Sequence, residues 1–156
     1  MKIHPLIAVF IPFITSGKSA RFRACLRLRE LFRKRKLWFF ADCVKGYLYT
    51  HFGCEISVNA QISTKAMFMH TVGVVVGEGC VIEDGVIIYS GVCLGRKDIN
   101  TEEYPIIKKN AVLCTGSIVL GKVTVGEGCV IGANSLVIID CEPNKTYVGS
   151  PAKCLK

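Results

Sequence analysis

Histidine is the residue type in this chain best suited to acid–base chemistry, and the chain has three of them. A neutral imidazole can take a proton from a substrate and later return it, which is the role of a general base. His4 lies in an apolar N-terminal run and His51 near a helix end, positions that indicate no chemistry. His70 lies two residues after a position of a regular repeat and beside a break in that repeat. A lone histidine is more often structural, but this position favours His70 as the catalytic candidate.

The repeat that must position His70 is a ladder of apolar residues spaced six apart. A six-residue period fits neither a helix, at about 3.6 residues, nor an alternating strand. It fits a short strand plus a turn, and three such sides make one coil of a parallel β-helix. A sandwich of short strands is the alternative, but sandwich strands vary in spacing. The thirteen ladder positions are Ile56, Ile62, Phe68, Val76, Ile82, Ile88, Leu94, Ile107, Leu113, Val119, Val125, Ile131 and Val137.

Two breaks interrupt this ladder. Phe68 and Val76 are eight residues apart, and Leu94 and Ile107 are thirteen apart. Insertions at the corners of a solenoid often form its binding face. The residue four after a ladder position is usually small or β-branched, Val72 among them.

The net charge of +8 is concentrated in one segment. Residues 18–36 hold nine Lys or Arg against Glu30 alone, and residues 18–50 are predicted to be helical. One interpretation is a basic, apolar helical segment that lies on an anionic membrane surface. The other is a helical cap on the open first coil, which a solenoid needs. The apolar run from Pro5 to Ile14 is too short to span a bilayer, and no motif supports nucleic-acid binding.

The nine cysteines are predicted to be reduced and structural. Cys80, Cys129 and Cys141 occupy small-residue positions of the repeat, where a free thiol packs like a small apolar side chain. No Cys-x-x-Cys pair with zinc spacing is present. We therefore expect a cytoplasmic protein, with the inner face of the membrane as a peripheral location.

The stretch around His70 resembles a known enzyme family. Residues 67–95, MFMHTVGVVVGEGCVIEDGVIIYSGVCLG, resemble the active-site coils of the serine acetyltransferase branch of hexapeptide-repeat acyltransferases. The closing GSPAK is similar to the Gly-x-Pro-Ala-Lys/Arg ending of that superfamily. The resemblance implies an all-β solenoid, a left-handed parallel β-helix with a short helical N-terminal segment, although crossovers are usually right-handed. It also implies a homotrimer with active sites between subunits and acetyl-CoA as the acyl donor.

The resemblance assigns roles to particular residues. His70 matches the family's catalytic histidine, and Gly116 and Ala133 match positions whose main chain faces the pantetheine arm. Lys153 and Lys156 match basic residues near the CoA phosphates. The expected domains are a basic, partly helical N-terminal segment (1–52), the acyltransferase β-helix (53–142) and a C-terminal tail that contributes to the CoA site (143–156).

Two departures from the family pattern bear on the acceptor. Met69 stands where serine acetyltransferases have Asp before the catalytic histidine, and Tyr104 stands where they have a histidine that helps to hold the serine carboxylate. Together with the short basic leader, these departures favour a related enzyme that O-acetylates a saccharide of capsule, exopolysaccharide or O-antigen, whose acceptor can be lipid-linked. Arg96 and Tyr104, in the loop RKDINTEEYPII, are then the expected acceptor contacts.

Three other functions are weighed beside the saccharide O-acetyltransferase. Serine O-acetylation is the alternative within the same chemistry. A non-catalytic hexapeptide scaffold is the alternative outside it, and it should tolerate loss of His70. A metal enzyme of the same fold, such as the carbonic-anhydrase type, needs three histidine ligands. The coils contain one, so no metal is expected.

Overall fold

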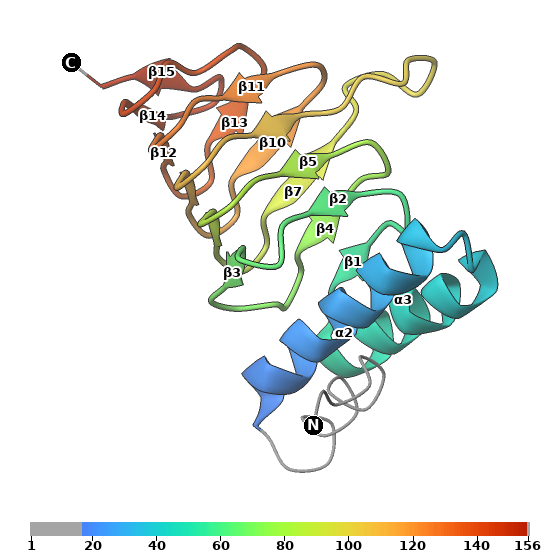
Figure 1. Cartoon of the computed structure of the whole chain (residues 1–156). Helices are drawn as coiled ribbons and strands as arrows, with labels where there is room; N and C mark the ends of the chain where they lie inside the picture. Colours follow the sequence, from blue (N-terminus) through green and yellow to red (C-terminus); the bar gives the residue numbers. More distant parts are fainter. Residues whose placement is uncertain (1–16, 156) are drawn as a thin grey trace.

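The computed structural model describes residues 17–155, which form a left-handed parallel β-helix closed at one end by two helices (Figure 1). Each coil has three sides, so the short strands stack into three parallel sheets. The first sheet contains β1 (Glu55–Ile56), β4 (Val75–Val76), β7 (Cys93–Gly95), β10 (Ile118–Leu120) and β13 (Leu136–Val137). The second contains β2 (Gln61–Ile62), β5 (Val81–Ile82), β8 (Ile106–Ile107) and β11 (Thr124–Val125). The third contains β3 (Met67–Phe68), β6 (Ile87–Ile88), β9 (Val112–Leu113), β12 (Val130–Ile131), β14 (Thr146–Val148) and β15 (Lys153–Cys154).

The predicted ladder is the core of the β-helix. Ile56 pairs with Val76, which pairs with Leu94, and the stack continues through the ladder residues of later coils. Twelve of the thirteen ladder side chains are buried, and Phe68 is half-buried against the core. The six-residue register read from the sequence is therefore confirmed.

The first insertion changes which residue points inward. Val72 stands four residues after Phe68 but is exposed, and Val74 is buried in its place. The reason is the two additional residues after Phe68, which bulge out of the coil before the next side begins. This bulge carries His70 to the surface.

The β-helix extends beyond the residues that the repeat pattern alone identifies. Strand β14 adds a further parallel rung to the third sheet, where Tyr147 pairs with Ile131 and is buried. The chain then reverses, and β15 pairs antiparallel to β14. The end of the chain is therefore packed on the last coils.

The helical segment consists of two helices that cover the first coil. They are α2 (Lys18–Lys34) and α3 (Trp38–Phe52) (Figure 1). Phe22 of α2 packs edge-to-face against Phe52, with centroids 5.2 Å apart, and against Phe68 of β3, at 5.0 Å. This packing agrees with the predicted cap. The expectations for residues 1–16, including His4 and the run from Pro5 to Ile14, lie outside the described residues; from residue 17 to 155, no helix has the length and apolar character to cross a bilayer.

Arg29 fastens helix α2 to the first coil. Its side chain is fully buried, and its guanidinium donates hydrogen bonds to the carbonyls of Ser57, Val58 (3.3 Å) and Ala60 (2.8 Å). Burial lowers the pKa of Arg29 to about 10, so the guanidinium stays charged at neutral pH. A guanidinium is planar and has several N–H donors. It can therefore donate to several carbonyls at one corner of a coil, where the backbone makes no strand pairing.

We expect Arg29→Ala to lower the free energy of unfolding by about 3 kcal/mol, because three carbonyls lose their hydrogen bonds from a buried guanidinium. Urea denaturation followed by far-UV circular dichroism measures the loss. Arg27→Ala is the matched control, since Arg27 is exposed on the same helix. An equal, small loss in both variants would show that Arg29 does not hold the cap.

All nine cysteines are free thiols. Burial raises the pKa of Cys54 and of Cys80 to about 12, so both thiols stay protonated at neutral pH. A protonated, buried thiol is neither a nucleophile nor a metal ligand. These cysteines therefore serve in packing.

Candidate functional site

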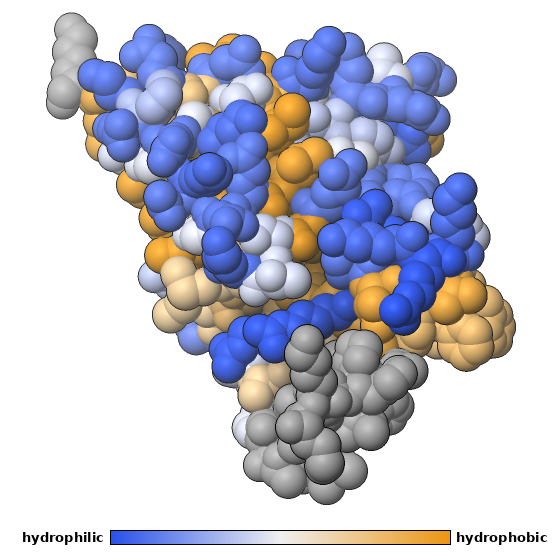
Figure 2. Space-filling view, viewed as in Figure 1, coloured by the Kyte–Doolittle hydropathy of each residue, from blue (hydrophilic) through white to orange (hydrophobic). Residues whose placement is uncertain are grey.

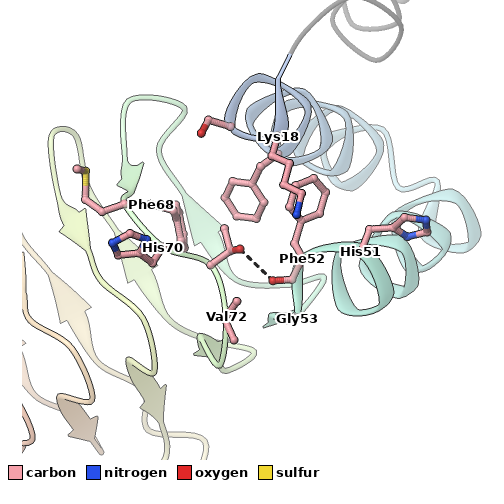
Figure 3. A pocket seen from close by; sticks show the side chains of 11 residues that line it. Lys18, His51, Phe52, Gly53, Phe68, His70 and Val72 are labelled. Atoms are coloured by element: carbon pink, nitrogen blue, oxygen red, sulfur yellow. Dashed lines mark hydrogen bonds between the residues drawn. The ribbon is translucent and has the colours of Figure 1, made fainter.

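His70 lies in a pocket between the first coil and the two helices. The pocket has a volume of about 380 Å³, and its wall combines the N-terminal turn of α2, the C-terminal end of α3 and the bulge after β3. Figure 3 shows His70 on the coil side and Lys18 extending from α2 toward Phe52. The other side chains in the wall come from Ser19, Phe22, His51, Phe68, Met69, Thr71 and Val72.

The bulge that carries His70 is held at both ends by hydrogen bonds. The Met69 amide donates to the Ile88 carbonyl at 2.9 Å, as a strand residue would. The Thr71 hydroxyl donates to the Phe52 carbonyl at 2.9 Å, which satisfies one of the free carbonyls at the end of α3 (Figure 3). The His70 backbone is therefore fixed relative to both the coil and the helices.

The His70 ring itself is exposed and available to a substrate. Its nearest aromatic neighbour is Tyr89 on the next coil, with ring centroids 6.4 Å apart. Within residues 17–155, no side chain or carbonyl accepts or donates a hydrogen bond at the imidazole. Met69, the residue that precedes it, offers no acceptor to fix the tautomer.

The charges around the pocket are positive. Lys18 is the lysine in the wall, and no Asp or Glu of the described residues lines it. His51, at the rim, is stacked on Tyr47 with centroids 4.0 Å apart, and its ring is turned away from His70 (Figure 3). A lysine in the wall suits a ligand that carries a negative group.

The helical wall of the pocket could not be predicted from the sequence. Lys18 and Phe22 lie in the basic segment, where the sequence offered a membrane surface or a cap as interpretations. Phe22 and Arg29 lie seven residues apart on one face of α2, and both are buried. The spacing puts both side chains on one face, but only the structure shows that this face is buried and which coil it meets.

The predicted pantetheine positions lie on the same edge of the β-helix as His70. The third sheet pairs Phe68 with Ile88, Ile88 with Leu113 and Leu113 with Ile131. The residue two after each of these strand ends is His70, Ser90, Thr115 or Ala133, so the four stack along one edge. With coils about 4.8 Å apart, the edge from His70 to the last coil is about 19 Å long.

This edge offers free backbone donors. The amide N–H groups of Ser90, Thr115 and Ala133 donate to no acceptor in the part of the chain that the structure describes. Gly116 has a positive φ of 70°, its amide donates to the Ser90 carbonyl at 2.9 Å, and a Cβ there would collide with the Asn134 side chain. The Asn134 side chain therefore fills the space beside Gly116, and the edge keeps open donors at Thr115 and Ala133.

The remaining predicted site residues divide into two groups. Lys153 is exposed in β15, where it pairs with Val148 of β14 beyond the last coil. Lys156 lies outside the described residues. Arg96 is exposed and donates to the Ile99 carbonyl at 3.0 Å, and Tyr104 packs its ring on the backbone of Gly77 and Gly79.

Arg96 and Tyr104 therefore do not line the His70 pocket of their own chain. Tyr104 is half-buried against the core, and its ring fills the space that a side chain at Gly79 would need. Among residues 17–155, no three His, Cys, Asp or Glu side chains are grouped so as to hold a metal ion.

The chain is similar to known proteins over most of its length. A serine acetyltransferase of Helicobacter pylori is 36% identical over 132 residues, which are 84% of this chain and 77% of that protein. A serine acetyltransferase of Bacillus subtilis is 38% identical over 128 residues, which are 81% of this chain and 59% of that protein. The chain spans about half the length of several curated relatives, 42% of one and 59% of another. No protein-family model matches it.

The fold is shared with solved structures. The structure of serine acetyltransferase from Brucella abortus in complex with coenzyme A matches with a TM-score of 0.84 and 28% identity, over 94% of this chain and 59% of that one. The expectation of a saccharide acceptor and of a role in polysaccharide synthesis is wrong, because the relatives are named serine acetyltransferases. Within its own chain, Tyr104 packs on glycine backbone and lies outside the pocket, so its replacement of histidine leaves the wall of that pocket unchanged.

Proposed function

This chain belongs to the serine acetyltransferase family, and from that premise we propose that it transfers an acetyl group from acetyl-CoA to the hydroxyl of L-serine. The observation that carries the proposal is the exposed His70 in a positively charged pocket, at the end of an edge with free backbone donors. The pocket would bind the amino acid, and the edge would bind the pantetheine arm of the donor.

In the proposed reaction, His70 is the general base. Its neutral imidazole takes the proton from the serine hydroxyl while the oxygen attacks the thioester carbonyl carbon. The tetrahedral intermediate places a negative charge on the former carbonyl oxygen, and a backbone N–H of the neighbouring coil, such as that of Ser90, is a suitable donor to it. The C–S bond then breaks, and the imidazolium returns the proton to the CoA thiolate.

The donor would run along the edge from Lys153 to His70. Carbonyl and amide groups of a pantetheine arm can pair with backbone groups whatever the side chains are, which fits the free amides of Thr115 and Ala133. Gly116 holds the positive φ of the turn beside Thr115, so its backbone would shape the edge along which the arm lies. Lys153 would meet a phosphate of CoA at the far end.

The acceptor carboxylate would pair with Lys18. An ammonium at the pocket wall attracts the carboxylate of serine and holds the hydroxyl toward His70. A neutral sugar has no group for this cation, so Lys18 supports an amino-acid acceptor over a saccharide.

We infer a homotrimer in which a neighbouring subunit covers the His70 edge. Large apolar side chains are exposed around His70 on β3, β4 and the bulge, and a second copy would bury them. They are Met67, Met69, Val72 and Val75. Residues of the neighbouring subunit would then complete the acceptor site.

The test of the proposed function is CoA release from acetyl-CoA, measured by mass spectrometry with L-serine and with sugar acceptors in parallel. Mass spectrometry is preferred because thiol dyes react with exposed cysteines such as Cys43 and Cys154. We expect release to depend on L-serine and O-acetylserine to appear. If acetyl-CoA binds but serine does not accelerate release, the proposed acceptor is wrong.

Lys18→Gln is expected to raise the KM for L-serine about tenfold to a hundredfold while kcat changes little, since a charged hydrogen bond to the carboxylate is lost. Steady-state kinetics at saturating acetyl-CoA measures both constants. Arg23→Gln, an exposed change on the same helix, is the matched control, and Lys18→Arg should restore part of the affinity. A fall in kcat with an unchanged KM would contradict a carboxylate contact.

A further inference from the structure

Large apolar side chains are exposed at the turn where α2 meets α3. Four consecutive residues, Leu37, Trp38, Phe39 and Phe40, are exposed, Phe39 to 75%. Figure 2 shows apolar side chains gathered beside hydrophilic ones at this end of the helical pair. Scattered apolar residues are ordinary on a surface, but four in succession at a protruding turn indicate a contact surface. We call Leu37–Phe40 the aromatic tip.

The aromatic tip has a defined conformation. The Lys36 amide donates to the Arg33 carbonyl at 3.0 Å and the Leu37 amide to the Phe32 carbonyl at 2.9 Å, a Schellman arrangement that ends α2. Phe40 packs between Phe32, at a centroid distance of 5.4 Å, and Phe39, at 5.6 Å. The tip therefore presents a preformed apolar surface.

Basic residues adjoin the aromatic tip. Arg33, Lys34, Arg35 and Lys36 immediately precede it, and Asp42 is the one acidic residue from 31 to 45. Glu30 pairs with Arg33 at 2.6 Å, and Lys34 is 3.7 Å from the same carboxylate, which leaves Arg35 and Lys36 without an acidic partner in the described chain. Lys36 adopts a positive φ of 57° at a position where glycine is usual.

We propose that the aromatic tip docks on an anionic lipid bilayer surface. Aromatic side chains at the level of the lipid headgroups, with lysine and arginine against anionic headgroups, are the combination by which proteins bind a membrane without crossing it. A second copy of this chain is the other candidate occupant. It fits less well, because two tips facing each other would bring Arg35 and Lys36 against their own copies.

Membrane docking at this place is compatible with catalysis. The tip lies at the C-terminal end of α2, whereas the His70 pocket lies at its N-terminal turn, about 25 Å away along a helix of 17 residues. The bilayer would therefore leave the pocket and the donor edge uncovered. The inference is independent of the identity of the acceptor.

The chain contains a single tryptophan, Trp38, and it lies in the aromatic tip. Its fluorescence therefore reports on the tip alone. With the full chain at low salt, we expect vesicles of phosphatidylcholine and phosphatidylglycerol to shift the emission to shorter wavelengths, and brominated lipid to quench it. Vesicles of phosphatidylcholine alone should do neither. An unchanged emission with the anionic vesicles would overturn the proposal.

Two variants test the two components of the surface by vesicle co-sedimentation. Arg35→Gln with Lys36→Gly removes both free charges, and glycine suits the backbone at position 36; we expect the partition coefficient to fall about thirtyfold. Phe39→Ser with Phe40→Ser should lower it at least tenfold.

Matched controls separate these effects from general surface changes. Lys122→Gln with Lys145→Gln removes two exposed lysines of the β-helix, and Ile99→Ser removes an apolar side chain that is 78% exposed. Neither control should change the partition coefficient. All four variants, the two at the tip and the two controls, should keep acetyl transfer, and retained activity would show that each variant folds. Equal losses in tip and control variants would overturn the proposal. A blue shift that follows protein concentration without lipid would also overturn it, in favour of self-association.

Discussion

Replacing His70 by alanine is expected to lower kcat for acetyl transfer to L-serine about a hundredfold to ten-thousandfold, the usual contribution of a positioned general base. The ring is exposed and makes no hydrogen bond within residues 17–155, so its loss should leave the unfolding temperature unchanged. CoA release measured by mass spectrometry gives the rate, and isothermal calorimetry shows whether acetyl-CoA still binds.

His51→Ala is the matched control for this experiment. His51 is an exposed histidine at the rim of the same pocket, but its ring is stacked on Tyr47 and turned away (Figure 3). Its replacement should change kcat only a few-fold. If His70→Ala lowers kcat less than tenfold, His70 has no part in the proton transfer. The non-catalytic scaffold would then become the better interpretation of the fold.

Val125→Asp is expected to abolish the folded β-helix. Val125 is fully buried in β11, and its strand pairs with β8 while an isolated bridge joins Val125 to Cys141. A carboxylate there would be buried without a partner, and that penalty can exceed the whole stability of a domain, which is about 5–15 kcal/mol. Each coil of a solenoid is supported only by its neighbours, so the disruption should spread along the β-helix.

Sedimentation velocity and far-UV circular dichroism measure this effect. Leu155→Asp is the matched control, since it also places a carboxylate on an apolar residue but at an exposed position. The control should sediment and melt like the unaltered chain. A normally folded Val125→Asp variant would mean that the inward register assigned to the ladder is incorrect.

Two replacements that look equivalent in the sequence have different surroundings in the structure. Met69 and Tyr104 both differ from the family pattern, and from the sequence alone both favour a different acceptor. In the structure, Met69 lines the pocket while Tyr104 covers Gly77 and Gly79. A residue type alone does not show whether a side chain faces a substrate or its own backbone.

The sequence by itself determined the coils, because the direction of a strand side chain is a local property. With a six-residue period, each of the thirteen ladder residues falls at the same position on its side of a coil, so the side chains share one direction. Almost all of these side chains are buried. The same six-residue period shows that the repeat is interrupted beside His70. The resemblance, also carried by local motifs, supplied the family and the positions Gly116 and Ala133.

The tertiary structure alone decided what surrounds His70. Lys18, Phe22 and Thr71 meet there because α2 docks on the first coil through Arg29, and no periodicity relates a helix to the coil on which it packs. Only the structure shows that Val72 points outward and that Tyr104 lies on glycines. Such contacts join residues distant in sequence, so they depend on how complete elements pack rather than on the spacing within any one of them.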